Sequence, residues 1–247
     1  MRKVAYLIII VATILSCTGK GYQDRPFGGM NGRVQEVLTY HRMPEMWYAG
    51  NTGTDVMFIT KSVYDINGFE ICSALIDSGG RIQSEAESMF EKGVCIRSTQ
   101  KAGGKINARI NLISDKKGEL EYTKEAGGKI IRMVVKESSF MRRHKSLVYE
   151  DGKLVSENII RTNSKGLPET VTIIDHKSNV HIVETNMYDN DGNIIEKHIT
   201  RSDERKEQIV YTDYFDQDEH GNWTEARTYN KNRLPEYVEQ REIKYWE

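Results

Sequence analysis

Few side chains in this sequence are spaced for catalysis or metal binding. No pair of histidines forms an HExxH motif or takes a cysteine–histidine zinc spacing, and no GxSxG nucleophile motif occurs. The sequence therefore predicts no catalytic residue, no metal site and no cofactor, and we expect the protein not to be an enzyme. The six histidines are His41, His144, His176, His181, His198 and His220.

Cys17 is the residue whose surroundings predict a chemical modification. Two basic residues precede an almost wholly apolar run, Val4 to Leu15, which is too short to span about 30 Å of hydrocarbon but has the length of a signal-peptide core. The run ends in Ile14-Leu15-Ser16-Cys17, which resembles the bacterial lipobox, although leucine is commoner than isoleucine at the first position. The resemblance implies cleavage of residues 1–16 and lipidation of Cys17. An ordinary signal peptide cut elsewhere is the alternative.

A lipid on Cys17 would tether the chain to a membrane of the cell envelope, and we expect the outer membrane, on its periplasmic or surface face. Residues 17–31 then form a tether, since their glycines and polar residues are typical of flexible linkers. A loop packed on the domain is the other interpretation of this stretch. Residues 32–247 make up the folded domain.

Two further cysteines, Cys72 and Cys95, lie in apolar, strand-like runs. In an oxidising envelope such a pair favours a disulfide, which would stabilise the fold by about 3 kcal/mol. Two buried free thiols fit the same surroundings equally well.

Aromatic residues concentrate in two parts of the chain and are candidates for a binding surface. Stacking on such side chains would hold a glycan or a peptide; the simpler interpretation is that they cover a single-layered sheet. These residues are Trp47, Tyr48, Trp223, Tyr229 and Trp246. The formal net charge of −1 gives no electrostatic reason to expect a nucleic-acid partner.

A recurring turn predicts the strands that would position these residues. Its core is a polar pair, then Gly, then a polar and an apolar residue, and successive copies lie about 12 residues or about twice that apart. Asp or Asn caps such a turn through its side chain, and Gly supplies the positive φ that hairpins need. Copies begin at Asp65, Asp77, Ala102, Asp115, Ala126, Glu150, Asn163, Asp189 and Asp218, with degenerate ones at His176 and Asn230.

Between the turns, apolar and polar residues alternate with period two, as in ETVTIID and EQIVYTDYF. We therefore predict an all-β domain, an open, curved antiparallel meander of about a dozen strands. Two stretches depart from this pattern. Ser84 to Lys92 is rich in Glu and Ala, which predicts one or two helical turns. The Gly, Asn and Thr residues of Pro44 to Thr54 predict a long loop.

One copy of the turn, Tyr188-Asp189-Asn190-Asp191-Gly192-Asn193-Ile194, resembles the YD (Rhs-type) repeat. Tyr64-Asp65-Ile66-Asn67-Gly68 matches the first half of that motif, and the copy around Asp218 is looser. The resemblance implies hairpins stacked edge to edge into a continuous, curved sheet. The chain is far too short for the closed shell that large Rhs proteins build, and the family supplies no catalytic residues.

Together these features predict a lipid-anchored envelope protein that acts as a non-enzymatic binding or scaffold module. The face or an edge of its sheet would capture an envelope protein or a glycan, and Arg33–His41 and Tyr237–Tyr245 are the expected edges. One alternative is a carrier of lipid or another hydrophobic ligand, of the lipoprotein-sorting type. Another is a glycan-binding module.

Overall fold

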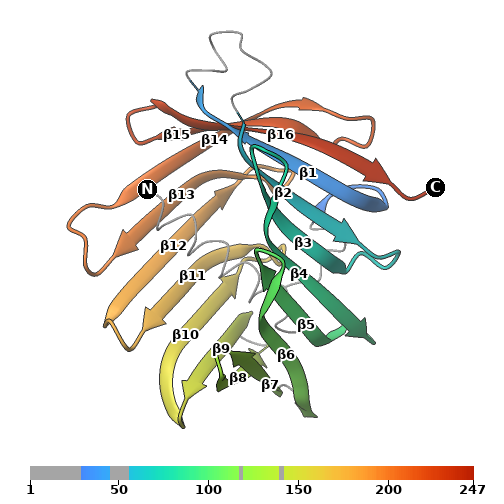
Figure 1. Cartoon of the computed structure of the whole chain (residues 1–247). Coiled ribbons are helices and arrows are strands. Elements are labelled where there is room, and N and C mark those ends of the chain that lie inside the picture. Colours follow the sequence, from blue (N-terminus) through green and yellow to red (C-terminus); the bar gives the residue numbers. More distant parts are fainter. Residues whose placement is uncertain (1–28, 45–55, 117–118, 139–141) are drawn as a thin grey trace.

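The computed structural model describes residues 29–44, 56–116, 119–138 and 142–247, which form one antiparallel β-sheet closed into a barrel. Figure 1 shows the sixteen strands following one another around this barrel. The strands are β1 (Val34–Arg42), β2 (Val56–Tyr64), β3 (Glu70–Asp77), β4 (Ile82–Glu91), β5 (Val94–Ala102), β6 (Lys105–Lys116), β7 (Glu119–Ala126), β8 (Lys129–Ser138), β9 (Arg143–Glu150), β10 (Lys153–Thr162), β11 (Pro168–Asp175), β12 (Val180–Tyr188), β13 (Ile194–Arg201), β14 (Gln208–Gln217), β15 (Trp223–Asn230) and β16 (Pro235–Tyr245).

The recurring turns join neighbouring strands, as the glycine spacing predicts. In the β2–β3 turn, Asp65 Oδ1 accepts hydrogen bonds from the backbone N–H groups of Asn67 and Phe69, both at 2.9 Å. The same pair of bonds, to the residues two and four positions on, recurs in five other turns. Their capping residues are Asp77, Asn163, Asp189, Asp218 and Asn230. Local side-chain capping thus sets this hairpin geometry.

The expectation of an open sheet is wrong, because β1 pairs with β16 and closes the barrel. In this antiparallel pair Thr39 lies opposite Arg241, while on its other side Thr39 lies opposite Thr60 of β2. The two segments expected to be free edges therefore form the seam, seen at the top of Figure 1. Closure satisfies the backbone N–H and C=O groups that an open meander would leave exposed.

The strand count also exceeds the expected dozen, because some turns lack the full motif. The β4–β5 turn uses Lys92 and Gly93, both with positive φ, and the β13–β14 connection contains no glycine. The predicted helix at Ser84–Lys92 is wrong, since β4 covers most of it and pairs with β3 and β5. Pairing on both sides outweighs a weak local helix propensity. The predicted loop lies almost wholly outside the described residues.

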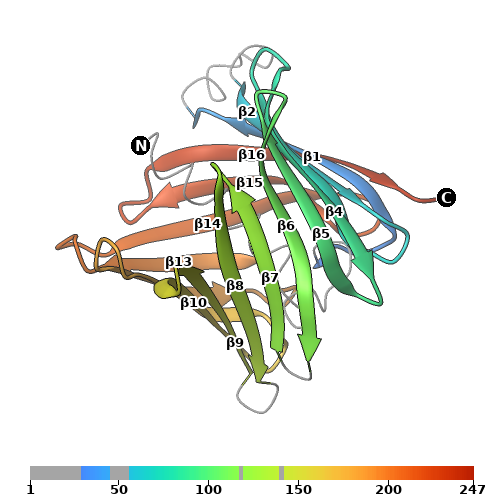
Figure 2. The same cartoon turned by 60° about the horizontal axis from the view of Figure 1, so that its bottom comes forward.

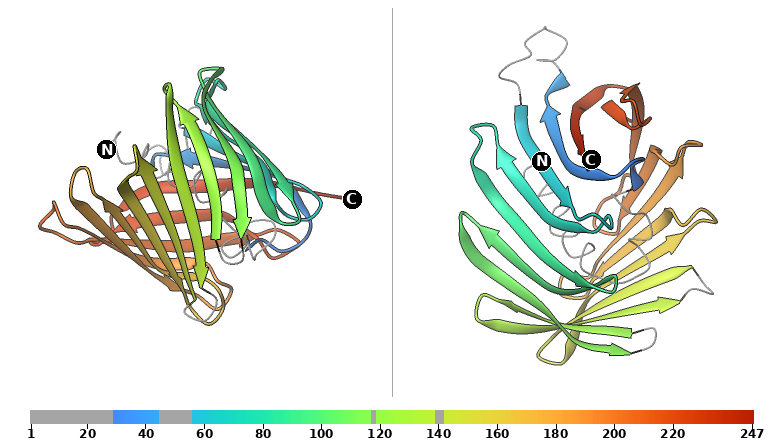
Figure 3. Two further views of the ribbon diagram at one scale, coloured as in Figure 1. Left: turned by 90° about the horizontal axis from the view of Figure 1, so that it is seen from below. Right: turned by 90° about the vertical axis from the view of Figure 1, so that its right-hand side faces the viewer.

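A barrel of sixteen strands is wide. Eight strands give an interior that side chains just fill, whereas sixteen leave a lumen between opposite walls. In Figures 2 and 3, β6–β8 and β14–β16 lie on opposite sides of the barrel. The described residues include no helix long and apolar enough to cross a membrane.

Candidate functional site: the barrel lumen

Alternation along each strand separates a lumen face from an outer face. On β6, Ala108 and Ile110 are buried, whereas Arg109 between them is exposed. Since side chains of consecutive residues point to opposite faces of a sheet, the strand registers extend this division around the whole barrel. The buried positions of β6 and their cross-strand partners therefore define the lumen face.

The outer face carries charged side chains joined in ion pairs. Glu36 lies 2.6 Å from Lys61 and 2.8 Å from Lys244, and Lys101 lies 2.9 Å from each of two glutamates. Similar pairs occur on other strands, which spreads charge over much of the outer wall. They include Arg132–Glu121, Lys145–Glu157 and His198–Glu196. Transmembrane barrels show the reverse, an apolar outer band and a polar lumen.

One part of the lumen face, the apolar wall, is packed like a protein core. It is built by β5–β8, and its side chains are at most 6% exposed. Such packing excludes water and contributes most of the free energy that burial supplies. The apolar wall consists of Val94, Ile110, Leu120, Tyr122, Met133 and Val135.

A second part, the hydroxyl strip, carries small polar side chains from β1 to β5. Neighbouring strands place Thr39 opposite Thr60, Ser62 opposite Ser73, and Ser88 opposite Ser98. Ser98 is 1% exposed and Ser88 donates to its hydroxyl at 3.3 Å, whereas the wider strip presents oxygen atoms with little bulk. We define the hydroxyl strip as Thr39, Thr60, Ser62, Ser73, Ser84, Ser88 and Ser98.

Arg241 is a cation on the lumen face, at the seam and beside the hydroxyl strip. The guanidinium carbon of Arg241 lies 3.3 Å from the centroid of the Trp223 ring, and Trp223 in turn lies 5.2 Å from the ring of Tyr214. Burial lowers the pKa of Arg241 to about 10, with Glu239 opposing the shift, so the side chain stays charged at neutral pH. Burial also raises the pKa of Tyr64 to about 12.

His41 and Glu239 form a second polar pair at the seam. His41 Nδ1 lies 3.3 Å from Glu239 Oε1, its Nε2 lies 3.3 Å from the Thr60 hydroxyl, and its ring stacks on Phe58. Burial and, secondarily, Arg241 lower the pKa of His41 to about 4. Burial raises the pKa of Glu239, and Arg241 opposes that rise. Desolvation thus disfavours the charged form of both partners.

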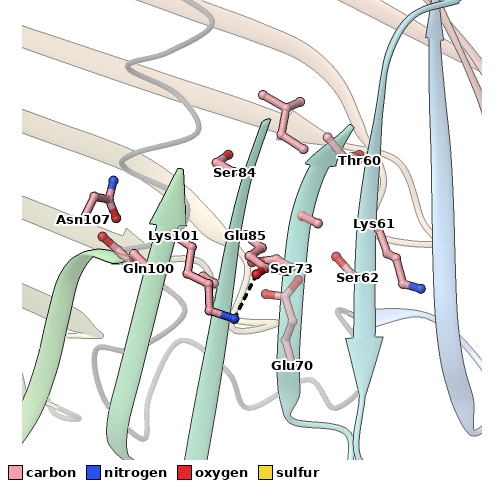
Figure 4. A pocket seen from close by; sticks show the side chains of 13 residues that line it. Thr60, Lys61, Ser62, Glu70, Ser73, Ser84, Glu85, Gln100, Lys101 and Asn107 are labelled. Carbon is pink, nitrogen blue, oxygen red and sulfur yellow. Dashed lines mark ion pairs between the residues drawn. The ribbon is translucent and has the colours of Figure 1, made fainter. Parts of the chain in front are cut away.

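A cavity of about 250 Å³ lies along β2–β6. Figure 4 shows its lining, in which the Glu85–Lys101 ion pair of the outer face lies near Ser73 and Ser84 of the hydroxyl strip. A chain of small residues therefore leaves open space along this wall, in contrast to the tightly packed β5–β8 region.

The structure does not bring the predicted aromatic surface together. Trp223 packs against Arg241, Tyr229 lies opposite Tyr211 toward the other end of β15, and Trp246 packs against Val34 and its neighbours beyond the end of β16. Trp47 and Tyr48 lie outside the described residues, as does Cys17.

The two remaining cysteines are not joined by a disulfide in this structure. Cys72 is half-buried on β3, and Cys95 is buried at the start of β5, where its Sγ lies 3.4 Å from the Arg97 carbonyl oxygen. Burial raises the pKa of Cys72. Within the described ranges no cluster of three or more His, Cys, Asp or Glu residues could hold a metal ion.

The sequence did not single out the residues around Arg241. Alternation over Tyr237–Tyr245 leaves open which set of residues faces inward, and only the pairing with β1 decides it. The available signal in the sequence was Arg241 itself, the single arginine of the run Tyr237–Tyr245, two positions from Glu239. In the structure it is in register with polar residues of β1.

A buried latch joins the start of the barrel to the β14–β15 turn. Asn31 N–H donates to Asn222 Oδ1 at 2.7 Å, and the Asn222 amide donates back to the Asn31 carbonyl oxygen at 2.9 Å. The same amide lies 2.8 Å from the Tyr245 hydroxyl, which also bonds Asp218. At 6% exposure, Asn222 is a buried side chain satisfied on both of its polar atoms.

No protein-family model matches the chain, and no curated protein matches it. Two solved structures are similar to this chain. One is a porin-like protein from Bacteroides uniformis, with 10% identity, a TM-score of 0.34, and coverage of 87% of this chain and 99% of that chain. The other is a porin-like protein from Bacteroides vulgatus, with 10% identity, a TM-score of 0.39, and coverage of 86% and 98%.

Proposed function

We propose that the protein is a lipid-anchored, non-enzymatic binding protein of the cell envelope, and that its barrel holds a hydrophobic or amphipathic ligand in the lumen. The inner face of the sheet is then the binding face. The expected edge capture is not proposed, since pairing of β1 with β16 removes both edges.

The observation that carries the proposal is the apolar wall on the lumen face, set against an outer face that carries many ion pairs. The ion pairs of the outer face suit water, while the lumen offers both the apolar wall and the hydroxyl strip. A lipid bilayer around this outer face would desolvate its ion pairs, which is costly. Its lumen, wide enough to leave space between walls, is the part suited to an apolar guest.

The membrane attachment rests on the sequence around Cys17. Its apolar run and lipobox-like end are typical of an exported chain anchored through an acylated cysteine. More than one acyl chain on that residue would give stable attachment, whereas one chain binds only marginally. The proposal therefore separates the two roles, with the lipid as anchor and the barrel as container.

Two measurements test the two roles. Labelling of cells with a clickable palmitate should mark the wild-type chain and leave Cys17→Ser unmarked; equal labelling of both would reject the anchor. Native mass spectrometry of the full chain should show a bound species that organic extraction removes, while the covalent lipid stays. A mass unchanged by extraction would reject the container.

A further inference from the structure

Arg241 is a half-buried cation whose Nε–H has no hydrogen-bond acceptor among the described residues. Its Nε is fully buried, and one face of the guanidinium is covered by Trp223 at 3.3 Å. An unmet buried donor costs about 1–3 kcal/mol, and more when it is charged. An arginine kept in this state indicates an acceptor that binds it.

No carboxylate among the described residues takes that place. Glu239 is the nearest candidate by sequence, but its Oε1 lies 3.3 Å from His41 Nδ1, and no ion pair joins it to Arg241 within the described ranges. Glu239 therefore shares the local field without supplying the missing acceptor. An external anion would meet an unpaired guanidinium in a site of low polarity, where such a bond is strong.

The neighbouring positions suit the oxygens of an oxyacid and then a hydrocarbon. Thr39 lies directly opposite Arg241, with Thr60 on the next strand, so hydroxyl groups border the cation. The next row along the sheet starts at Ile243 and Val37 and reaches Ala108. Between them it passes Ser62, Ser73, Ala86 and Gln100. Ala108 is followed on the same face by Ile110, where the apolar wall begins.

We propose that Arg241 is the anion site of the lumen and that it binds the carboxylate or phosphate head of an amphipathic ligand whose tail runs from the seam along the lumen face toward the apolar wall. This inference rests on the proposed function and names the chemistry of its ligand. A guanidinium offers parallel N–H groups to either oxyanion, which a lysine cannot reproduce.

The test compares probes of one tail length that differ in the head. Octanoate, octyl phosphate and octanol are titrated calorimetrically into the full chain, processed by the cell and kept soluble in amphipol. Both anions should bind at least about tenfold more tightly than octanol, as expected for a charge-assisted pair. Inorganic phosphate is the tail-free arm, and it should bind far more weakly than octyl phosphate.

Variants locate the preference on one side chain. Arg241→Gln should bring both anions to the affinity of octanol and leave octanol unchanged, while Arg241→Lys should keep only part of the preference. Arg227→Gln is the matched control, because Arg227 lies on the opposite face of β15, paired with Glu225 and stacked on Phe215. Its preference for anions should equal that of wild type. Far-UV circular dichroism checks that each variant folds.

The outcomes separate the two proposals. Equal wild-type affinity for octanoate and octanol would overturn the anion site and leave the container standing. Binding of none of the three tailed probes would overturn both. Phosphate binding as tightly as octyl phosphate would overturn the amphipathic ligand, since a free anion would then suffice. An anion preference that survives in Arg241→Gln would remove the assignment to Arg241.

Discussion

The apolar wall and the seam are two parts of one inner face, and they differ in the polarity of their side chains. On β5–β8 the inward side chains are apolar, tightly buried and packed on one another. At the seam the inward side chains include Arg241, Glu239 and His41, whose ionisable groups are desolvated and only partly paired. The same backbone and alternation carry both, so the difference comes from side chains alone. The apolar wall serves stability, and the seam keeps polar groups at a cost in stability that binding could recover.

The apolar wall should dominate stability. Ile110→Ala deletes a side chain of 0% exposure and should lower the free energy of unfolding by about 3 kcal/mol, measured from urea denaturation midpoints. Ile113→Ala on the same strand is the control, because Ile113 is 56% exposed on the outer face. Equal losses in the two variants would contradict the division of the strand into buried and solvated faces.

The seam should respond to acid where the apolar wall does not. Burial lowers the pKa of His41 from 6.5 to about 4, so the unfolded chain binds this proton more readily. The contribution of His41 to stability is therefore complete above pH 6.5 and is lost as the pH falls through about 4. The loss amounts to at most about 3 kcal/mol. His41→Gln should flatten this acid dependence in chemical denaturation at several pH values.

His198→Gln is the control for that titration. Hydrogen bonds that the His198 ring donates to the Glu196 and Glu207 carboxylates raise the pKa of His198. Its contribution therefore has the opposite sign: it is present at low pH and is lost as the pH rises through the raised value. Removing it should leave the acid loss in place. An acid loss that persists unchanged in His41→Gln would show that the seam histidine is not the group responsible.

The latch beside the seam should have a smaller effect. Asn222→Ala removes the bonds to Asn31 and to the Tyr245 hydroxyl and leaves buried partners unsatisfied, which should cost about 2 kcal/mol in urea denaturation. Asn190→Ala, in the exposed β12–β13 turn, should change stability very little. Loss of the same size in both variants would assign the effect to turn formation in general.

The outer face should show the smallest effect. Lys101→Gln breaks two ion pairs, at 2.9 Å to Glu85 and 2.9 Å to Glu87, yet the unfolding midpoint should not move measurably. Exposed ion pairs gain little because water screens them and long side chains lose freedom. A clear drop in the midpoint would mean that the outer face also contributes to stability.

Residues that act locally were predictable from the sequence. Asp65, Asp189 and Asp218 each cap a turn through bonds that span four residues, and the glycine spacing located these turns without knowledge of the fold. Between them, period-two alternation gave strands in the expected order. Strand pairing then follows from chain order in a meander, since each hairpin brings consecutive strands together.

Closure was not predictable in this way, because the β1–β16 pairing joins residues about two hundred positions apart. Nothing in the alternation of either segment distinguishes an edge strand from a seam strand. The site could not be predicted for the same reason. Trp223 was expected on an exposed surface, and only the pairing of β16 with β1 shows that Arg241 faces the lumen. β4 was missed for the converse reason, since its Glu and Ala residues favour a helix locally while two partner strands hold it extended.

The latch also sets how the barrel would stand at a membrane. Asn222 fixes Asn31 at one end of the barrel, beside the seam. An anchor upstream of Asn31 would therefore attach the barrel to the membrane at that end. If Cys17 carries the proposed lipid, the chain from Cys17 to Asn31 reaches at most about 50 Å when fully extended. The barrel would then be tethered close to the bilayer without being fixed in orientation. It would be free to turn and tilt, while the end that holds the latch stays within that radius of the bilayer.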